Sequence, residues 1–330
     1  MSRVKLGDVA REHKETIKGD KSNYPIVGLE HLIPENIRLT QWDYNKENTF
    51  TKVFRKGCVL FGRRRAYLKK AVYADFDGIC SGDITIIEAI PGKILPELLP
   101  FVIQNDDLFD YAVGKSAGSL SPRVKWEHLK NYEFELPDVE KQHELAQILW
   151  SIVETKESYE RLMAATDELV KSQFIELSKS GRKCLIRELC TPFSSNLLIN
   201  KLQDNNGKYP LYGATGIVKG IDFYRQEDPY LSIIKWGAGV GRVELHEGKS
   251  SIVGSLQGII PNDGVDINWL YYALKYSDLA KYATNTTVPN LYFKDYGELE
   301  LIYPENMQKE IVSFIKQSDK SKFQVGGIAA

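Results

Sequence analysis

Residues 137–181 decide the fold of this chain, and they read PDVEKQHELAQILWSIVETKESYERLMAATDELVKSQFIELSKSG. Apolar side chains recur here in alternating steps of four and three residues over about four to five heptads, which is typical of a long amphipathic helix. At 1.5 Å per residue, this helix would be roughly 60 Å long. The apolar positions of the predicted seam are Leu145, Leu149, Ile152, Tyr159, Met163, Val170 and Leu177.

The ends of this segment suit a helix. Pro137 and Asp138 favour a helix start, since proline lacks the N–H that would remain unpaired and a carboxylate faces the positive end of the dipole. Gly181 favours a stop. An equally ordinary interpretation of the apolar stripe is the core face of a globular helix.

Length and composition indicate a folded protein with two domains. The chain has 330 residues, 43% hydrophobic and 26% charged, with a net charge of −1. This length suits two domains of about 130 to 150 residues better than one core. The sequence contains no apolar run of 18 residues and no secretory signal, so we expect a cytoplasmic protein without a membrane association.

The four cysteines are Cys58, Cys80, Cys184 and Cys190. No two of them have the spacing of two to four residues that zinc sites favour, and the chain has no secretory signal. We therefore expect reduced, buried thiols and no metal site.

A basic window lies between Glu47 and Asp75, where no acidic residue occurs. Its cations alternate with aromatic residues, as is expected where a protein surface meets phosphates. A second segment, residues 114–123 (GKSAGSLSPR), combines glycine, hydroxyl and cationic residues and suits a loop around a backbone phosphate. The alternatives are a solvated charged face and an ordinary solvent loop.

The second half of the chain repeats the first. Residues 24–28 (YPIVG) recur as 209–213 (YPLYG), and residues 59–63 are matched with 233–237. Further matches are 81–87 with 253–260, the expected helix 96–111 with 268–282, 134–137 with 301–304, and 142–145 with 308–311. Because the offset falls along the chain, we expect extra sequence in the first copy near residues 31–47.

These observations predict a mixed α/β fold with two similar domains, each followed by a helix. The expected boundaries are residues 1–136, 137–181 for the long helix, 182–303, and 304–330 for a second helix and tail. Two similar surfaces joined by a rod suit contact with two half-sites along DNA, and the half-sites need not be the same.

Several segments together resemble the specificity subunit of type I restriction-modification systems, and the resemblance covers nearly the whole chain. In the first half they are residues 60–70 (LFGRRRAYLKK), 115–121 (KSAGSLS), 126–129 (WEHL) and 135–137 (ELP) leading into Gln142. In the second half they are 237–241 (GAGVG) and 286–291 (TTVPNL).

The resemblance implies two target-recognition domains, each reading half of a split double-stranded DNA target. The two long helices would pair as an antiparallel coiled-coil spacer that sets the gap. It also implies two modification subunits, which carry S-adenosylmethionine and methylate adenine, and restriction subunits, which use ATP and Mg. This chain itself would carry no cofactor.

The residues agree that the chain is not a catalyst. It has no Asn-Pro-Pro-aromatic segment and no phosphate-binding loop of the GxxxxGK[ST] type. Asp138, Glu154 and Lys156 have the residue order of a nuclease site, but the two acids are about 24 Å apart on one predicted helix. A nuclease acting alone and a protein scaffold without DNA affinity are the alternatives.

Cationic, amide and hydroxyl side chains are the candidates for DNA contact, because they suit phosphates and base edges. In the first half they are Arg63, Arg64, Arg65, Lys69, Lys115, Ser119 and Arg123. In the second half they are Lys219, Arg225, Lys235, Arg242, Thr286, Asn290 and Tyr292.

The second helix departs from the family pattern, because its heptad character ends after Phe323. It would cover only about half of the first seam. An exposed apolar stripe usually finds another chain. We therefore expect self-association through residues 159–177, or coverage of this stripe by the modification subunits.

Overall fold

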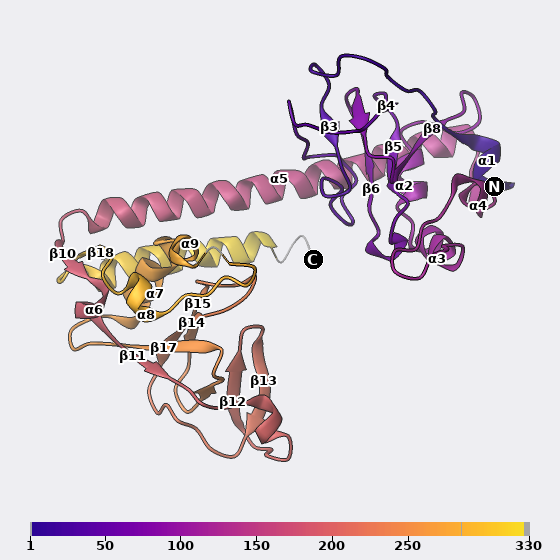
Figure 1. Ribbon diagram of the computed structural model, residues 1–330. Helices are drawn as coiled ribbons and strands as arrows, with labels where there is room; N and C mark the ends of the chain where they lie inside the picture. The colour runs from indigo at the N-terminus through magenta and orange to yellow at the C-terminus, as the bar shows by residue number, and fades with distance from the viewer. Residues whose placement is uncertain (1, 285, 327–330) are drawn as a thin grey trace. The chain divides into compact units, whose positions relative to one another are not determined.

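The computed structural model describes residues 2–284 and 286–326, with side chains as far as residue 318 (Figure 1). The chain divides into two compact units, Met1–Tyr159 and Glu160–Ala330. The division falls inside the long helix α5 (Val139–Ser178). Each unit is described by itself.

Unit 1 is built on a four-stranded antiparallel sheet of order β2-β8-β5-β6. A three-stranded sheet, β3-β7-β4, and a two-stranded ribbon, β1-β9, complete its strands. The strands are β1 (Ser2–Lys5), β2 (Ala10–Glu12), β3 (Ile26–Val27), β4 (Lys52–Phe54), β5 (Val59–Gly62), β6 (Ala71–Tyr73), β7 (Gly78–Cys80), β8 (Ile84–Ala89) and β9 (Glu133–Leu136). The helices are α1 (Leu6–Val9), α2 (Leu99–Ile103), α3 (Asp106–Gly114) and α4 (Trp126–Leu129), with a 3-10 turn at Ala66–Leu68.

Both faces of the four-stranded sheet are covered, which explains why β5 and the first half of β8 consist mostly of buried apolar residues. Val59 and Phe61 point into a cluster with residues of α1, α2 and α3. Leu60 and Ile86, on the opposite face, pack with residues of the three-stranded sheet. The strand period of two places alternate residues in these two cores.

Unit 2 repeats this architecture after α5. Its four-stranded sheet has the order β11-β17-β14-β15, and it also has a three-stranded sheet, β13-β12-β16, and a ribbon, β10-β18. The strands are β10 (Arg182–Leu185), β11 (Cys190–Ser194), β12 (Tyr209–Gly213), β13 (Gly216–Ile221), β14 (Tyr230–Ile234), β15 (Val243–His246), β16 (Ser251–Ile252), β17 (Leu256–Pro261) and β18 (Glu300–Tyr303). The helices are α6 (Ile186–Leu189), α7 (Ile267–Tyr276), α8 (Phe293–Tyr296) and α9 (Gln308–Gly326), with 3-10 turns at Ile199–Leu202 and Leu279–Tyr282.

The predicted repeat is therefore confirmed for the four-stranded sheet and the two-stranded ribbon, and one matched pair shows it at atomic detail. Buried Gln142, at the start of α5, accepts a hydrogen bond from the Leu95 N–H at 2.9 Å. Buried Gln308, at the start of α9, accepts one from the Asp266 N–H at 2.7 Å. Gln142 thus ties α5 to the segment before α2, and Gln308 ties α9 to the segment before α7.

The predicted long helix is confirmed as α5, with each half packed in its own unit. Leu145 and Leu149 pack against the core of unit 1. Val170 is buried and Leu177 is half-buried in the core of unit 2. Of the remaining predicted seam positions, Ile152 and Met163 are exposed and Tyr159 is half-buried.

Within unit 2, α9 lies against the end of α5. Arg182 and Tyr303 are opposite each other in the β10-β18 ribbon, which α5 enters and α9 leaves. Phe174 of α5 shares an apolar cluster with Ile311 and Ile315 of α9. The two helices consequently run in opposite directions, as Figure 1 shows. The predicted loss of heptad character after Phe323 concerns side chains outside those described.

Gly181 has a different role from the predicted helix stop. The helix ends at Ser178, and a Cβ on Gly181 would lie 2.4 Å from the Tyr303 carbonyl oxygen. Close backbone approach, not a helix cap, accounts for this glycine. Among the residues described, no helix is both long and apolar enough to span a membrane.

Candidate nucleic-acid interface

In unit 1 the basic segment after β5 is fastened to the loop of residues 115–124. The Arg65 N–H donates to the Pro122 carbonyl at 2.9 Å, and the Val124 N–H donates to the Arg63 carbonyl at 3.0 Å. The two candidate segments, about sixty residues apart in sequence, thus form one surface, which we call junction 1 (residues 63–65 and 115–124).

One carboxylate organises the arginines of junction 1. Arg123 donates to both oxygens of Asp83, at 2.8 and 3.2 Å. Arg63 and Arg64 lie 3.7 and 3.8 Å from the same carboxylate. The hydrogen bond from Arg123 is the largest cause that lowers the pKa of Asp83, and the charges of the three guanidinium groups act in the same direction. Three cations around one anion leave junction 1 with excess positive charge.

Unit 2 contains the same connection with different side chains. The Gly237 N–H donates to the Pro289 carbonyl at 3.2 Å, and the Leu291 N–H donates to the Lys235 carbonyl at 2.9 Å. We call this surface junction 2 (residues 235–237, 284 and 286–292). By these hydrogen bonds Trp236 occupies the position of Arg64. The isolated bridge of Trp236 with Asn290, which matches that of Arg64 with Arg123, gives the same equivalence.

This equivalence corrects the sequence alignment. The predicted match of residues 59–63 with 233–237 is displaced by two residues, because the hydrogen bonds pair Arg63 with Lys235 and Arg65 with Gly237. The apolar runs of β5 and β14 look alike in either register, so sequence similarity alone could not choose between the two.

Junction 2 is less cationic and more aromatic than junction 1. Trp236 is 44% exposed, and its indole N–H donates to the Tyr292 hydroxyl at 3.4 Å. The Lys235 ammonium lies 5.0 Å from the centre of the Trp236 ring. The Lys235 side chain is buried, and this burial lowers the pKa of its ammonium.

With this geometry in place, comparison with known proteins identifies the chain. A family model described as the type I restriction modification DNA specificity domain matches residues 1–164 and 184–325. The chain belongs to this family. It is a DNA-sequence recognition subunit of a type I restriction-modification system and is not itself a catalyst.

Solved structures agree with the fold of a specificity subunit. The S subunit of the type I system from M. genitalium aligns over 99% of this chain and 91% of that chain, with a TM-score of 0.58 and 16% identity. A second solved structure comes from work on complex assembly and conformational transition of the type I R-M system. It aligns over 99% of this chain and 92% of that chain, with a TM-score of 0.55 and 19% identity. No curated protein matches the sequence.

The remaining candidates of unit 1 lie in different surroundings. Arg65, Lys115 and Ser119 are exposed, and Lys115 lies over the Tyr111 ring at 5.6 Å. Lys69 forms an ion pair with Asp106 at 2.6 Å, which occupies its ammonium. The specificity subunit therefore presents Arg65, Lys115 and Ser119 to solvent beside the arginine cluster.

In unit 2 the candidates separate into two groups. Thr286 and Asn290 belong to junction 2 with Lys235 and Tyr292. Three others are engaged within the domain: Lys219 donates to the carbonyls of Leu202 and Gln203 at 2.7 and 3.0 Å, Arg225 to Asn196 at 2.8 Å, and Arg242 to Glu244 at 3.0 Å and to the Ala214 carbonyl. These bonds give Lys219 a structural role in holding its neighbouring loop.

Two features of the junctions were missed in the sequence. Trp236 stands between Lys235 and Gly237, and only its pairing across the fold reveals it as the counterpart of Arg64. Asp83 organises the arginines although it lies outside the basic window. Leu120 of junction 1 is 92% exposed.

The nuclease-like residue order has a structural explanation. Asp138 accepts a hydrogen bond from the Lys141 N–H at 3.0 Å at the start of α5, and this bond is the largest cause that lowers the pKa of Asp138. Glu154 lies 3.5 Å from Arg38. One acid caps the helix and the other forms an ion pair, as befits a non-catalytic specificity subunit.

Two groups of side chains among the described residues have the composition of a metal site. They are His13 with Cys58 and Glu88, and Glu30 with His31 and Asp43. In the second group, His31 Nδ1 accepts a hydrogen bond from the Gly28 N–H at 2.9 Å, so neutral His31 carries its proton on Nε2, facing Asp43. That nitrogen has no free lone pair for a metal.

Proposed function

We propose that this specificity subunit reads a bipartite DNA target, with junction 1 contacting one half-site and junction 2 the other. The observation that supports this most strongly is the equivalence of Arg64 with Trp236 and of Arg123 with Asn290. The backbone frame is the same, whereas the side chains it presents differ in chemistry. The two half-sites would therefore differ in sequence.

The side chains suggest how each half-site is read. Arginine donates two hydrogen bonds to guanine O6 and N7 or contacts phosphates, and asparagine pairs with adenine N6 and N7. In junction 1 the guanidinium cluster around Asp83 supplies both kinds of contact. In junction 2 Asn290 would read a base edge, and exposed Trp236 would supply an apolar contact.

The long helix is proposed to set the gap between the half-sites. We assign residues 1–136 and 182–303 to the recognition domains, 137–181 to the spacer, and 304–330 to its shorter partner. Support comes from α5, which continues without interruption from one unit into the other.

The exposed apolar positions of α5 are proposed to dock the partner subunits. They are Val139, Ile148, Ile152, Leu162, Met163, Leu169 and Ile175. Two modification subunits carrying S-adenosylmethionine, and restriction subunits using ATP and Mg, would assemble here in the cytoplasm. Self-association through residues 159–177 is the alternative use of this surface, and a scaffold without DNA affinity is the competing function.

The decisive experiment compares Arg64→Ala and Trp236→Ala in the complex with modification subunits, selected on a duplex pool with both half-sites randomised. Loss of a base contact should cost about 1–3 kcal/mol and relax specificity at that base pair. Arg64→Ala should affect one half-site and Trp236→Ala the other. If Arg64 contacts a phosphate, affinity should fall for all sequences and the salt slope should decrease by about 1.

Arg3→Ala is the matched control, because Arg3 is an exposed arginine of unit 1 paired with Glu133 outside the junction. It should leave the selected sequences unchanged. Selection of the wild-type target by both junction variants at wild-type affinity would contradict the proposal.

A second experiment tests the spacer by inserting one heptad into α5 after Lys156. Seven residues lengthen a helix by about 10.5 Å, close to three base pairs at 3.4 Å each, and keep the apolar face in phase. The selected target should keep both half-sites while its gap grows by about three base pairs. An unchanged gap would show that α5 does not set the distance.

A further inference from the structure

Three strands of unit 1 bring His13, Cys58 and Glu88 together on one face of the sheet. Arg11 is opposite Glu88 in the β2-β8 pair, and His13 follows Arg11 by two residues, on the same face. The β5-β8 register, continued by one residue, places Cys58 opposite Glu88. The backbone pairing alone therefore predicts that these side chains meet.

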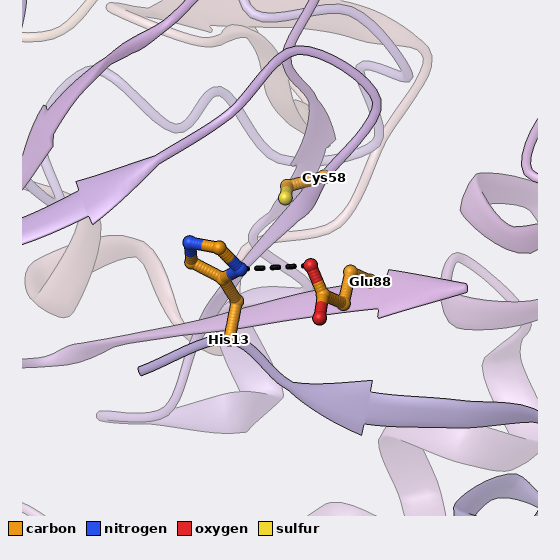
Figure 2. A group of neighbouring side chains, drawn as sticks. All are labelled: His13, Cys58 and Glu88. Atoms are coloured by element: carbon orange, nitrogen blue, oxygen red, sulfur yellow. Dashed lines mark hydrogen bonds and ion pairs between the residues drawn. The ribbon is translucent and has the colours of Figure 1, made fainter. Parts of the chain in front are cut away.

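The atoms are close enough to share a ligand. One imidazole nitrogen, the Cys58 sulfur and a Glu88 oxygen all lie within 4.8 Å of one another. Figure 2 shows the imidazole and the carboxylate side by side with the sulfur above them, and the His13 Nδ1 to Glu88 Oε2 distance is 2.7 Å. Cys58 is buried, whereas the side chains of His13 and Glu88 are 16% and 24% exposed, which leaves a path for an ion.

The surroundings hold each group in place. His13 Nε2 lies 3.3 Å from Glu15 Oε2, and Arg55 donates to that same oxygen at 2.9 Å. Arg11 donates to Glu88 Oε1 at 2.5 Å and leaves Oε2 facing His13. A metal-binding histidine almost always donates its second N–H to a carboxylate, a backbone carbonyl or water, and the carboxylate of Glu15 occupies that position.

The second copy shows that the fold does not require this polar group. In unit 2 the same register places Phe193, Tyr230 and Ile260 at the positions of His13, Cys58 and Glu88. Phe193 and Tyr230 pack edge to face, with ring centres 5.6 Å apart. Unit 2 thus fills the position with apolar contacts, whereas unit 1 has an imidazole, a thiol and a carboxylate.

We propose that His13 Nδ1, Cys58 Sγ and Glu88 Oε2 bind one divalent ion of the zinc class, with water as the fourth ligand. Nitrogen, sulfur and oxygen donors in four-coordinate geometry are typical of zinc. Bonds of about 2.0–2.1 Å at tetrahedral angles separate nitrogen and oxygen by about 3.3 Å. Binding therefore replaces the 2.7 Å hydrogen bond and moves the two atoms apart by about 0.6 Å.

The proton and charge changes are simple. The ion displaces the thiol proton of Cys58 to solvent. His13 binds as the neutral imidazole and keeps one proton on Nε2, which donates to Glu15; a proton on Nδ1 moves to Nε2 or, where both nitrogens are protonated, to solvent. The role is structural, because the ion would link β8 to the segments that flank β2 and β5.

The test uses the full-length protein, freed of metal by a chelator and then titrated with Co²⁺ and Zn²⁺. Cobalt should bind one equivalent with the absorption of a thiolate-to-cobalt charge transfer, and zinc should displace it. Cys58→Ser should abolish this absorption. Cys80→Ser is the matched control, since Cys80 is a buried free thiol of the same unit, and it should leave the absorption unchanged.

Two further variants keep the test informative if Cys58→Ser misfolds. Glu15→Gln should retain the absorption and weaken zinc binding by about 10–100-fold, as expected for an outer partner. His13→Phe, which introduces the residue of unit 2, should abolish binding while the fold is kept. The absence of a thiolate-to-cobalt band in the wild type at saturating cobalt would overturn the proposal, and so would unchanged zinc affinity in His13→Phe.

Discussion

Each unit has its own four-stranded sheet, and the two sheets have the same topology. The units differ in the topology of the smaller, three-stranded sheet. Strand order and register are the same in β2-β8-β5-β6 and β11-β17-β14-β15. In the smaller sheets, β3 and β7 pair in parallel, as do β12 and β16, but the third strand joins β7 in unit 1 and β12 in unit 2. The shared core is maintained by burial on both faces, whereas the smaller sheet tolerates a change of topology.

In the junctions, too, the backbone is the same in both units and the side chains differ. Backbone hydrogen bonds fix equivalent positions in both units, yet those positions hold Arg64 in one and Trp236 in the other. Exposed junction side chains such as Trp236 are not constrained by the core, so they would be free to change with the DNA that we propose they contact. A duplicated recognition unit can therefore acquire a second specificity without a second fold.

The largest difference in stability between the two units should be produced by Trp269→Ala in α7. Trp269 is fully buried, with ring contacts to Phe174 at 6.4 Å and Tyr303 at 5.3 Å. Removing the indole should destabilise unit 2 by about 3–5 kcal/mol. Because Leu95 corresponds to Asp266, buried Leu98 corresponds to Trp269, and Leu98→Ala should destabilise unit 1 by roughly 2–5 kcal/mol. Hydrogen exchange should show lost protection in one unit for each variant. Loss in both units would mean that they unfold together.

A smaller difference in stability between the units should depend on pH and should come from His246 of unit 2. His246 is buried, Nε2 is 2.7 Å from the Ser232 hydroxyl, and burial lowers its pKa to about 4. Because the unfolded chain takes up the proton first, unit 2 should lose stability as the pH falls from about 6.5 to about 4. The loss should approach about 3 kcal/mol, at 1.36 kcal/mol per pKa unit.

The matched control is His246→Ala, because the register places Ala74 at this position in unit 1. The variant should be less stable at neutral pH and should lack the pH dependence between 6.5 and 4. Denaturation of each unit followed by hydrogen exchange measures both quantities. An unchanged pH dependence in the variant would assign it to other groups.

The smallest losses of stability should come from Gln142→Ala in unit 1 and Gln308→Ala in unit 2. Each change leaves a backbone N–H, that of Leu95 or Asp266, without its partner. The expected cost is about 1–3 kcal/mol in the unit concerned. Similar losses would confirm that the two glutamines are equivalent, and a loss at only one would break the correspondence at the starts of the two spacer helices.

Much of the fold was predictable because its signals are local. The heptad pattern predicted α5, and the repeated segments predicted the second unit. The position of the additional sequence agrees as well: more residues separate Val27 from Val59 than separate their counterparts Tyr212 and Leu231. The junctions were predictable only in part, because Arg63, Arg64 and Arg65 stand out as a run, whereas Trp236 and Asp83 do not.

By itself, the sequence determined a long helix between two related domains, a basic aromatic segment, and the family to which the chain belongs. These features depend on periodicity and on neighbouring residues. Only the tertiary structure decided that Arg64 corresponds to Trp236, that Asp83 gathers three arginines, and that His13, Cys58 and Glu88 meet. The physical reason is that strand pairing joins residues far apart in the chain, and a register is set by many backbone hydrogen bonds at once.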